Sequence, residues 1–268
     1  MANGSVVFVG IAPHPPIMVP EVGGQMADEV RGSIDAMREL TERVIASGAE
    51  TVVTISPHAP LEARAFVAYD GPRLSGDFAN FRAPQATVAA DVDAELLAAI
   101  KEHAALDGYS VVALKGRSLD HGTAVPLYFL LRNGWGGRVV SLGYSFLSDE
   151  DHVRFGHCVR RACEASGRQV AFIASGDLSH RLKPDAPAGY NPDAHLFDEE
   201  VVEAIKACVP NNIAKIDPAL RRLAGECGYR SMLTALGVSE GEGCEILHYE
   251  APFGVGYLVA QISRQGDS

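Results

Sequence analysis

Short apolar runs alternate with longer amphipathic segments along almost the whole 268-residue chain. Runs such as "TVVTIS" (51–56) and "QVAFIAS" (169–175) are apolar on both faces, which is typical of parallel strands buried between two helical layers. The predicted strands are 5–11, 51–56, 64–69, 110–115, 138–143, 169–175, 244–250 and 255–262. Apolar residues at helical spacing predict helices over about 24–47, 91–105, 125–132, 148–166, 194–208 and 228–237.

This order of elements predicts an α/β three-layer fold. Its central sheet is expected to be mixed and largely parallel, flanked by helices and closed by a C-terminal antiparallel strand pair. Two stretches rich in Gly and Pro, 70–90 and 181–193, are expected to be long loops of the kind that often form lids or binding loops. The sequence contains no repeat, low-complexity segment or linker, so we expect residues 1–268 to form a single domain.

Composition and charge argue against several classes of partner and location. The formal net charge of −11 and the lack of a Lys/Arg-rich run argue against nucleic acid or an anionic membrane as a partner. No apolar run approaches the roughly 20 residues of a membrane span, and no secretory signal is recognised, so we expect a cytoplasmic protein. The five cysteines are odd in number and form no CxxC pair, which favours reduced thiols over a disulfide framework.

Four of the nine histidines follow predicted strands. They are His14 in "APHPP", His58 in "SPHAP", His121 in "LDHG" and His180 in "GDLSH". Ligands of open α/β sheets gather at the carboxyl ends of the strands, so the sheet is expected to bring these side chains together across one crevice. The flanking prolines restrict the backbone at His14 and His58, which suits side chains that must hold a fixed direction.

Two neutral imidazoles suit Zn, Fe, Cu or Ni, and a third ligand would decide among these metals. A carboxylate would complete the two-histidine, one-carboxylate site of non-heme Fe(II) oxygenases. The acids expected near the same crevice are Asp77, Asp120, Asp177 and Glu226.

The ordered set "PHPP", "SPHAP", "DHGTAVPL", "GDLSH" and "GECGYRSMLTALG", from about residue 6 to residue 262, resembles the class III (LigB-type) extradiol ring-cleavage dioxygenases and the related Memo-like proteins. The resemblance implies one LigB-like catalytic domain over 1–268. It implies that His14, His58 and Glu226 hold Fe(II), that His180 is the acid/base, and that His121 lines the dioxygen side. Memo-like relatives have a cysteine at the third-ligand position. Glu226 and Cys227 are adjacent here, so the third ligand stays open between them, and a thiolate would favour Zn or Cu.

The function expected from the resemblance is Fe(II)-dependent extradiol cleavage of a catechol-type ring by O2, with a small aromatic diol and dioxygen as the partners. Phe78, Phe81 and Tyr190, from the two long loops, are candidates for stacking on the ring. The alternatives are a Memo-like metal-binding or interaction protein without dioxygenase activity, and a metal-dependent hydrolase. The sequence leaves open which catechol is used, and whether the chain forms a homo-oligomer or needs a separate partner subunit.

Overall fold

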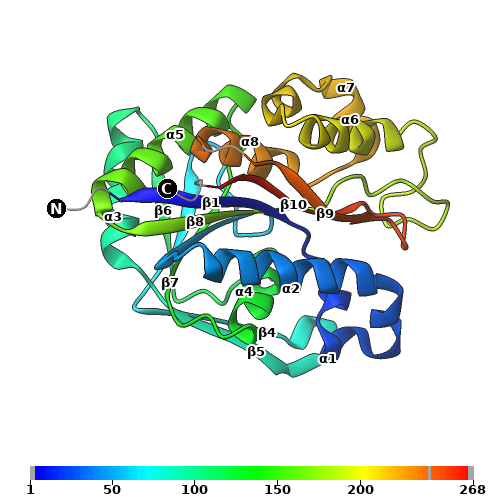
Figure 1. The fold of residues 1–268 in the computed structure, drawn as a ribbon, viewed down its shortest axis with the longest axis horizontal. Coiled ribbons are helices and arrows are strands. Elements are labelled where there is room, and N and C mark those ends of the chain that lie inside the picture. The colour runs from blue at the N-terminus through cyan, green and yellow to red at the C-terminus, as the bar shows by residue number, and fades with distance from the viewer. Residues whose placement is uncertain (1–3, 241–242, 265–268) are drawn as a thin grey trace.

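The computed structural model describes residues 4–240 and 243–264. Its core is an eight-stranded mixed sheet in the order β6-β3-β7-β2-β8-β1-β10-β9 (Figure 1). The four central strands β7, β2, β8 and β1 are parallel, whereas β10 runs antiparallel to both β1 and β9. The strands of this sheet are β1 (Ser5–Ala12), β2 (Thr51–Ser56), β3 (Phe66–Asp70), β6 (Val111–Lys115), β7 (Arg138–Gly143), β8 (Gln169–Ser175), β9 (Glu245–Glu250) and β10 (Tyr257–Arg264). The predicted fold class is confirmed.

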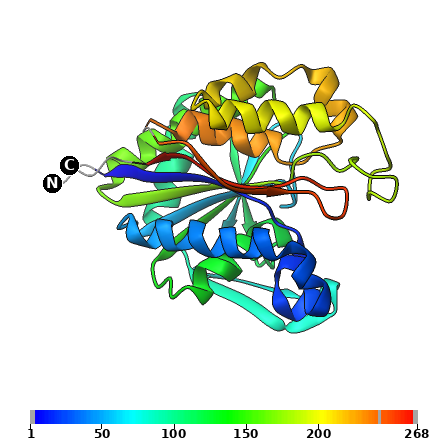
Figure 2. The same cartoon turned by 45° about the vertical axis from the view of Figure 1, so that its right-hand side comes forward.

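Helices cover both faces of the sheet (Figures 1 and 2). One layer contains α2 (Arg31–Ala46) and α4 (His121–Arg132), with the short α1 (Pro20–Gly23) beside it. The other contains α5 (Asp149–Ser166), α6 (His195–Lys206), α7 (Pro218–Ala224) and α8 (Tyr229–Val238), and α3 (Ala94–Leu106) packs against α5. Every residue of β2 is buried, because both faces of this strand lie under helices. Within the described residues, no helix is both long and apolar enough to cross a membrane.

Local sequence signals explain where α5 begins and ends. The side chain of Ser148 accepts a hydrogen bond from the backbone of Asp151, and the side chain of Asp151 accepts one from the backbone of Ser148, so the pair forms a capping box. The helix stops at Gly167, which adopts a left-handed φ of 71° that a residue with a side chain rarely takes. The helix was predicted over 148–166 and is observed over Asp149–Ser166, with Ser148 as its N-cap.

Two expectations for local structure were wrong, and one helix had not been predicted. The stretch 70–90 is a β-hairpin of β4 (Arg73–Phe78) and β5 (Ala83–Asp91), not a loop. The residues of β4 alternate strictly between exposed and buried, but the Gly and Pro of this region concealed that pattern. The predicted helix over 24–47 divides into a 3-10 segment, Gly24–Val30, and α2. Helix α7 had not been predicted, whereas 181–193 is irregular as expected.

The parallel register aligns the carboxyl ends of the central strands. Ala12 at the end of β1 pairs with Ser175 at the end of β8, and Ser56 at the end of β2 pairs with Gly143 at the end of β7. The residues two positions beyond β1, β2 and β8 are His14, His58 and Asp177. The sheet therefore delivers these three side chains to the same edge.

Candidate metal centre

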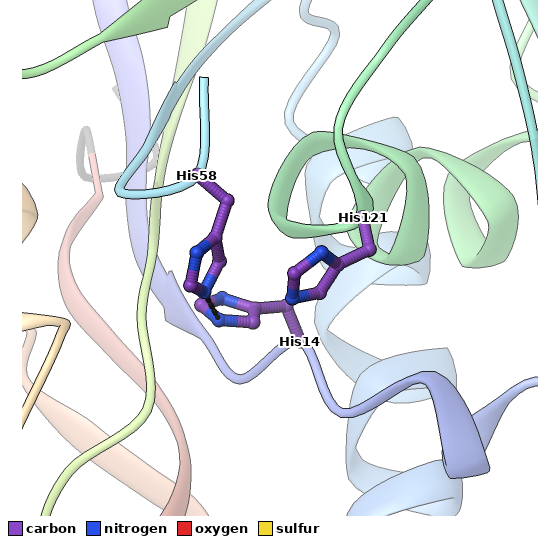
Figure 3. A group of neighbouring side chains, drawn as sticks. All are labelled: His14, His58 and His121. Carbon is purple, nitrogen blue, oxygen red and sulfur yellow. Dashed lines mark hydrogen bonds between the residues drawn. The ribbon is translucent and has the colours of Figure 1, made fainter. Parts of the chain in front are cut away.

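Three histidines from separate elements converge beyond the strand ends (Figure 3). His121 is the first residue of α4, and it joins His14 and His58 from the two strand exits. The Nε2 atoms of His14 and His58 are 3.0 Å apart, and the rings of His58 and His121 stack with centroids 4.2 Å apart. The ligand nitrogens of all three lie within 4.8 Å of one another. This grouping offers several imidazole ligands to one metal ion.

Ser175 determines which nitrogen of His14 faces the other imidazoles. Its hydroxyl donates a hydrogen bond of 2.5 Å to the carbonyl oxygen of Gly122. The serine oxygen therefore accepts the Nδ1–H of His14, 2.9 Å away. In a neutral imidazole, a protonated Nδ1 leaves the lone pair of Nε2 free. The buried His14 is thus set in the tautomer that binds a metal through Nε2.

Asp120 holds the turns that carry the other two histidines. Its side chain caps the N-terminus of α4, directly before His121. Its Oδ1 accepts a hydrogen bond of 2.5 Å from the hydroxyl of Ser56, which in turn accepts the backbone N–H of His58 at 3.1 Å. Its Oδ2 accepts from the hydroxyl of Tyr69 at 2.9 Å. Asp120, one of the four candidate acids, therefore has its carboxylate occupied by loop anchoring.

A buried carboxylate and a thiol lie against the same nitrogen of His14. Oδ2 of Asp177 and Sγ of Cys227 are each 3.7 Å from Nε2 of His14. Oδ1 of Asp177 also accepts the backbone N–H of His14 at 3.0 Å. The two segments meet because Gly176 packs directly on Gly228, where neither position has space for a Cβ. His14, Asp177 and Cys227 form a second group with ligand atoms within 4.8 Å.

Burial makes this cluster receptive to a cation. Desolvation, together with the neighbouring imidazoles, lowers the pKa of His14 well below its ordinary value and that of His58 to about 4. Burial also lowers the pKa of His121. It raises the pKa of Asp177 to about 7 and that of the Cys227 thiol well above its usual range. At neutral pH the three imidazoles are therefore uncharged, and their lone pairs fit a metal ion.

His180, the predicted acid/base, lies in the irregular loop that follows β8. Its backbone N–H donates to the carbonyl of Ala224 at 2.9 Å, which fixes the loop under α7. Burial lowers the pKa of its imidazole, and the nearby His58 lowers it further. Its Nδ1 is buried and has no hydrogen-bond partner among the residues that the structure describes. His180 thus presents a neutral imidazole close to His58.

Glu226, expected as the third ligand, makes a different contact. Its Oε2 accepts the backbone N–H of Tyr229 at 2.7 Å, at the start of α8. It is in neither group of clustered ligand atoms found within residues 4–240 and 243–264. Burial raises its pKa, against the opposing effect of Arg221 and Arg230. Between the two adjacent candidates, Cys227 is the residue that contacts His14.

The candidate ring-stacking residues are dispersed. Phe81 at the tip of the β4–β5 hairpin meets the ring of His121 edge-on, with centroids 5.3 Å apart. Phe78 is completely buried in the core, and Tyr190 is 56% exposed. Asp77, another candidate acid, accepts a backbone hydrogen bond at the same hairpin tip. Of these residues, Phe81 is the one in contact with the histidine cluster.

Sequence reasoning missed three residues around the cluster: Ser175, Tyr144 and Arg230. Ser175 carries a weak signal, as a polar residue that ends an apolar strand whose next residues are "GDLSH". Tyr144 likewise follows directly on β7. Nothing in the spacing of Arg230 marks it, because its place depends on how α8 packs against the β7 exit.

A comparison with protein families gives a match that spans most of the chain. The family described as the catalytic LigB subunit of aromatic ring-opening dioxygenase matches residues 9–260.

Two curated proteins are similar in sequence. Protein CA_C1420 of Clostridium acetobutylicum is 37% identical over 264 residues, which cover 94% of this chain and 56% of that protein. MEMO1 family protein Mbar_A1422 of Methanosarcina barkeri is 30% identical over 141 residues, which cover 50% of this chain and 49% of that protein. The chain thus spans about half the length of these relatives.

Among solved structures, the crystal structure of uncharacterized protein JW3007 from Escherichia coli K12 superposes with a TM-score of 0.64 at 17% identity. The superposition covers 96% of this chain and 100% of that one. At this level of identity, the likeness shows a shared fold.

Proposed function

The chain belongs to the family of the catalytic LigB subunit of aromatic ring-opening dioxygenases, and from this premise we propose that it opens the ring of a small catechol-type diol with O2 at a bound metal ion. The observation that carries the proposal is the convergence of His14, His58 and His121. Two imidazoles and one carboxylate are enough protein ligands to hold a metal ion. A further histidine at the cluster, and His180 close to it, are groups that a reacting site needs.

The residues fit a divalent cation. His14 belongs to both groups of ligand atoms, and its Nε2 is the atom that faces the others. We propose His14 and His58 as imidazole ligands and Asp177 as the carboxylate, in place of the Glu226 expected from the sequence. Oδ2 of Asp177 lies 3.7 Å from Nε2 of His14, and His14 is the residue that joins the histidine group to the group with Asp177. Two imidazoles and a carboxylate favour Fe(II). When bound, the ion would lower the pKa of the diol and bring it together with O2.

The chain's own groups then have distinct tasks. His180 accepts a proton from a diol hydroxyl on its imidazole and later returns it, for which a neutral ring is required. His121, held at the start of α4, donates a hydrogen bond toward negative charge that develops on the oxidant side. Phe81 supplies an apolar edge beside His121 that excludes water. Both atoms of O2 enter the ring-opened product, so the reaction balances without an external reductant.

The experiment is anaerobic loading with Fe(II), followed by a panel of catechols with oxygen uptake and the yellow ring-fission chromophore as readouts. The expected result is one O2 consumed per ring opened. His180→Gln is expected to lower kcat by about 10²–10⁴-fold, the usual contribution of a general acid/base, while metal content stays at the wild-type level. Wild-type protein with a full complement of iron and no turnover across the panel would refute the dioxygenase.

A second candidate function rests on Cys227. Its Sγ is 3.7 Å from Nε2 of His14, and one relative is named as a MEMO1 family protein. A thiolate with imidazoles favours Zn or Cu(I) over iron. A metal-binding protein without oxygenase activity would therefore hold such an ion through Cys227. Tight binding of Zn or Cu(I) that depends on Cys227, together with absent oxygen uptake, would support this alternative.

A further inference from the structure

Two cysteines outside the metal centre meet between the end of α6 and the start of β9. Cys208 directly follows the C-cap of α6, and Cys244 directly precedes β9. The backbone N–H of Cys244 donates to Sγ of Cys208 at 3.3 Å, although the two residues are 36 positions apart in the sequence. The thiol of Cys244 also interacts with the side chain of Cys208. Both the amide and the thiol of Cys244 therefore contact the same sulfur, and we call these two residues the Cys208–Cys244 pair.

Cys208 occupies a backbone position that glycine usually fills. Helix α6 ends in a Schellman motif, in which the N–H of Cys208 donates to the carbonyl of Ile205 at 2.9 Å. The N–H of Val209 donates to the carbonyl of Ala204, also at 2.9 Å. The residue after the C-cap of this motif takes a left-handed φ, which is 53° for Cys208. A side chain makes this conformation costly, and strain of this kind is concentrated at functional positions.

The two thiols differ in access and in acidity. Cys208 is exposed, whereas Cys244 is half-buried and its thiol donates to the carbonyl of Ile262 at 3.4 Å. Burial, together with the contact with Cys208, raises the pKa of the Cys244 thiol to about 12. Cys244 therefore keeps its proton at neutral pH, while its backbone N–H stabilises negative charge on the sulfur of Cys208. Cys208 is thus the accessible nucleophile, and Cys244 is in place to react with it afterwards.

The other three cysteines do not share this combination of access and partner. Cys158 and Cys163 are completely buried on α5, and burial raises the pKa of Cys163 to about 12. The thiol of Cys227 lies against His14 in the metal centre.

A bond between the two sulfurs would join two elements that already support the loop after β8. Near the start of α6, Asp198 accepts a hydrogen bond of 2.8 Å from the hydroxyl of Tyr249, near the end of β9. The same carboxylate accepts the backbone N–H of Ser179 in that loop. The Cys208–Cys244 pair lies at the opposite ends of the same helix and strand. A covalent bond there would therefore hold α6 and β9 together at both ends.

We propose that the Cys208–Cys244 pair is a redox site that closes to a reversible disulfide on reaction with a low-molecular-weight disulfide such as glutathione disulfide. The thiolate of Cys208 attacks one sulfur of this oxidant, the S–S bond of the oxidant breaks, and one glutathione leaves as a thiolate. Cys244 then attacks the Cys208 sulfur of the mixed disulfide and displaces the second glutathione. The protein loses two electrons and two protons, and the oxidant is reduced to two thiols. The site is separate from the metal centre and does not depend on the proposed function.

The test is equilibration of the full chain, in chelator, with mixtures of reduced and oxidised glutathione. Peptide mapping is expected to find Cys208 linked to Cys244, and the mass of the intact chain should fall by that of two hydrogen atoms. Tm should rise by roughly 5–10 °C over the reduced protein, because the bond restricts the unfolded chain across 36 positions. Reduction with dithiothreitol should reverse both changes.

Cys208→Gly is the main variant, because glycine suits the left-handed φ and the reduced variant should fold at least as well as the wild type. It should form no cross-link and show no rise in Tm with the oxidant. Cys244→Ser should stop at a mixed disulfide on Cys208. Cys227→Ala is the matched control, since it removes the thiol of the metal centre, and it should keep both the cross-link and the rise in Tm.

Three results would overturn the redox site. They are a glutathione mixed disulfide that persists on Cys208 of the wild type, a cross-link that joins other cysteines instead, and an oxidised wild type without the rise in Tm. Mass and Tm in chelator are measured without metal or oxygen uptake, so failure of the dioxygenase would leave this result unchanged.

Discussion

Nδ1 of His14 lies 2.9 Å from Oγ of Ser175, and this contact fixes the tautomer of the buried imidazole. The serine hydroxyl also donates a hydrogen bond to the carbonyl of Gly122, the residue that follows His121 in the chain. A single hydroxyl therefore orients one candidate ligand and ties it to the turn that presents another. The loss of an outer contact of this kind typically lowers metal affinity by about 10–100-fold.

Replacing Ser175 by alanine should weaken metal binding, because Nδ1–H of His14 then loses its acceptor and both tautomers become accessible. The expected loss is about 10–100-fold in affinity, measured by competition with a chromophoric chelator. Ser141→Ala is the matched control. It removes another buried serine, which hydrogen-bonds Thr123 at 3.1 Å, and should leave metal affinity within about twofold of wild type. Equal affinity losses in the two variants would show a general effect of packing.

The third ligand can be identified by three substitutions. Asp177→Asn should lower Fe(II) affinity more than tenfold. The loss of a hydrogen bond to a ligand already lowers metal affinity by about 10–100-fold, and the loss of a ligand should lower it at least as much. Glu226→Gln should leave affinity unchanged, since its amide oxygen can still accept the backbone N–H of Tyr229. Cys227→Ala should lower affinity for Zn and Cu(I) more than for Fe(II). Iron loss in Glu226→Gln, with Asp177→Asn retaining iron, would restore the ligand set expected from the sequence.

Metal loading should stabilise the fold, because the ligand cluster exists only in the folded chain. At a free metal concentration 100 times Kd, the free energy of unfolding should rise by about 2.7 kcal/mol. For a chain of this size, that corresponds to roughly 5–10 °C in Tm. His58→Ala should lose most of this increment, while the Tm measured in chelator changes little, because His58 lies at the open side of the cluster, where neighbouring groups desolvate its ring but the residue as a whole is solvent-exposed. Calorimetry with and without chelator measures both, and a metal-independent Tm in the wild type would contradict the site.

The sequence predicted the sheet well because its signals are local. The runs "TVVTIS" and "QVAFIAS" are doubly apolar, and both strands have the predicted bounds. Because ligands gather at the carboxyl ends of strands, the sequence also predicted that His14 and His58 lie close together in space. The structure confirms that these two side chains meet, at 3.0 Å between their Nε2 atoms.

What the sequence did not predict depends on tertiary contacts. Glu226 and Cys227 are neighbours in the chain, and spacing does not tell which of them faces His14. The packing of Gly176 on Gly228 brings Cys227 to His14 and leaves Glu226 at the backbone of α8. The same holds for Arg230, whose neighbours Tyr144 and Phe146 lie in the segment after β7, more than eighty residues earlier in the chain.

Asp198 gives the protein a pH dependence outside the metal centre. Its carboxylate is 1% exposed, and it accepts the backbone N–H of Ser179 at 2.9 Å and the hydroxyl of Tyr249 at 2.8 Å. It therefore ties the loop of His180 to α6 and β9. Burial outweighs these bonds and raises the pKa of Asp198 to about 7.

Because the folded state keeps this proton up to about pH 7, whereas the unfolded chain releases it near pH 4, the folded state binds more protons between these values. Stability should therefore fall as pH rises through this window, by up to about 4 kcal/mol from this group. Asp198→Asn cannot ionise, so denaturant unfolding in chelator between pH 5 and 7.5 should show a flatter profile. Asp107→Asn is the control, because Arg161 lowers the pKa of this carboxyl and keeps it ionised across the window. A slope unchanged in Asp198→Asn would show that Asp198 is already ionised in the folded protein.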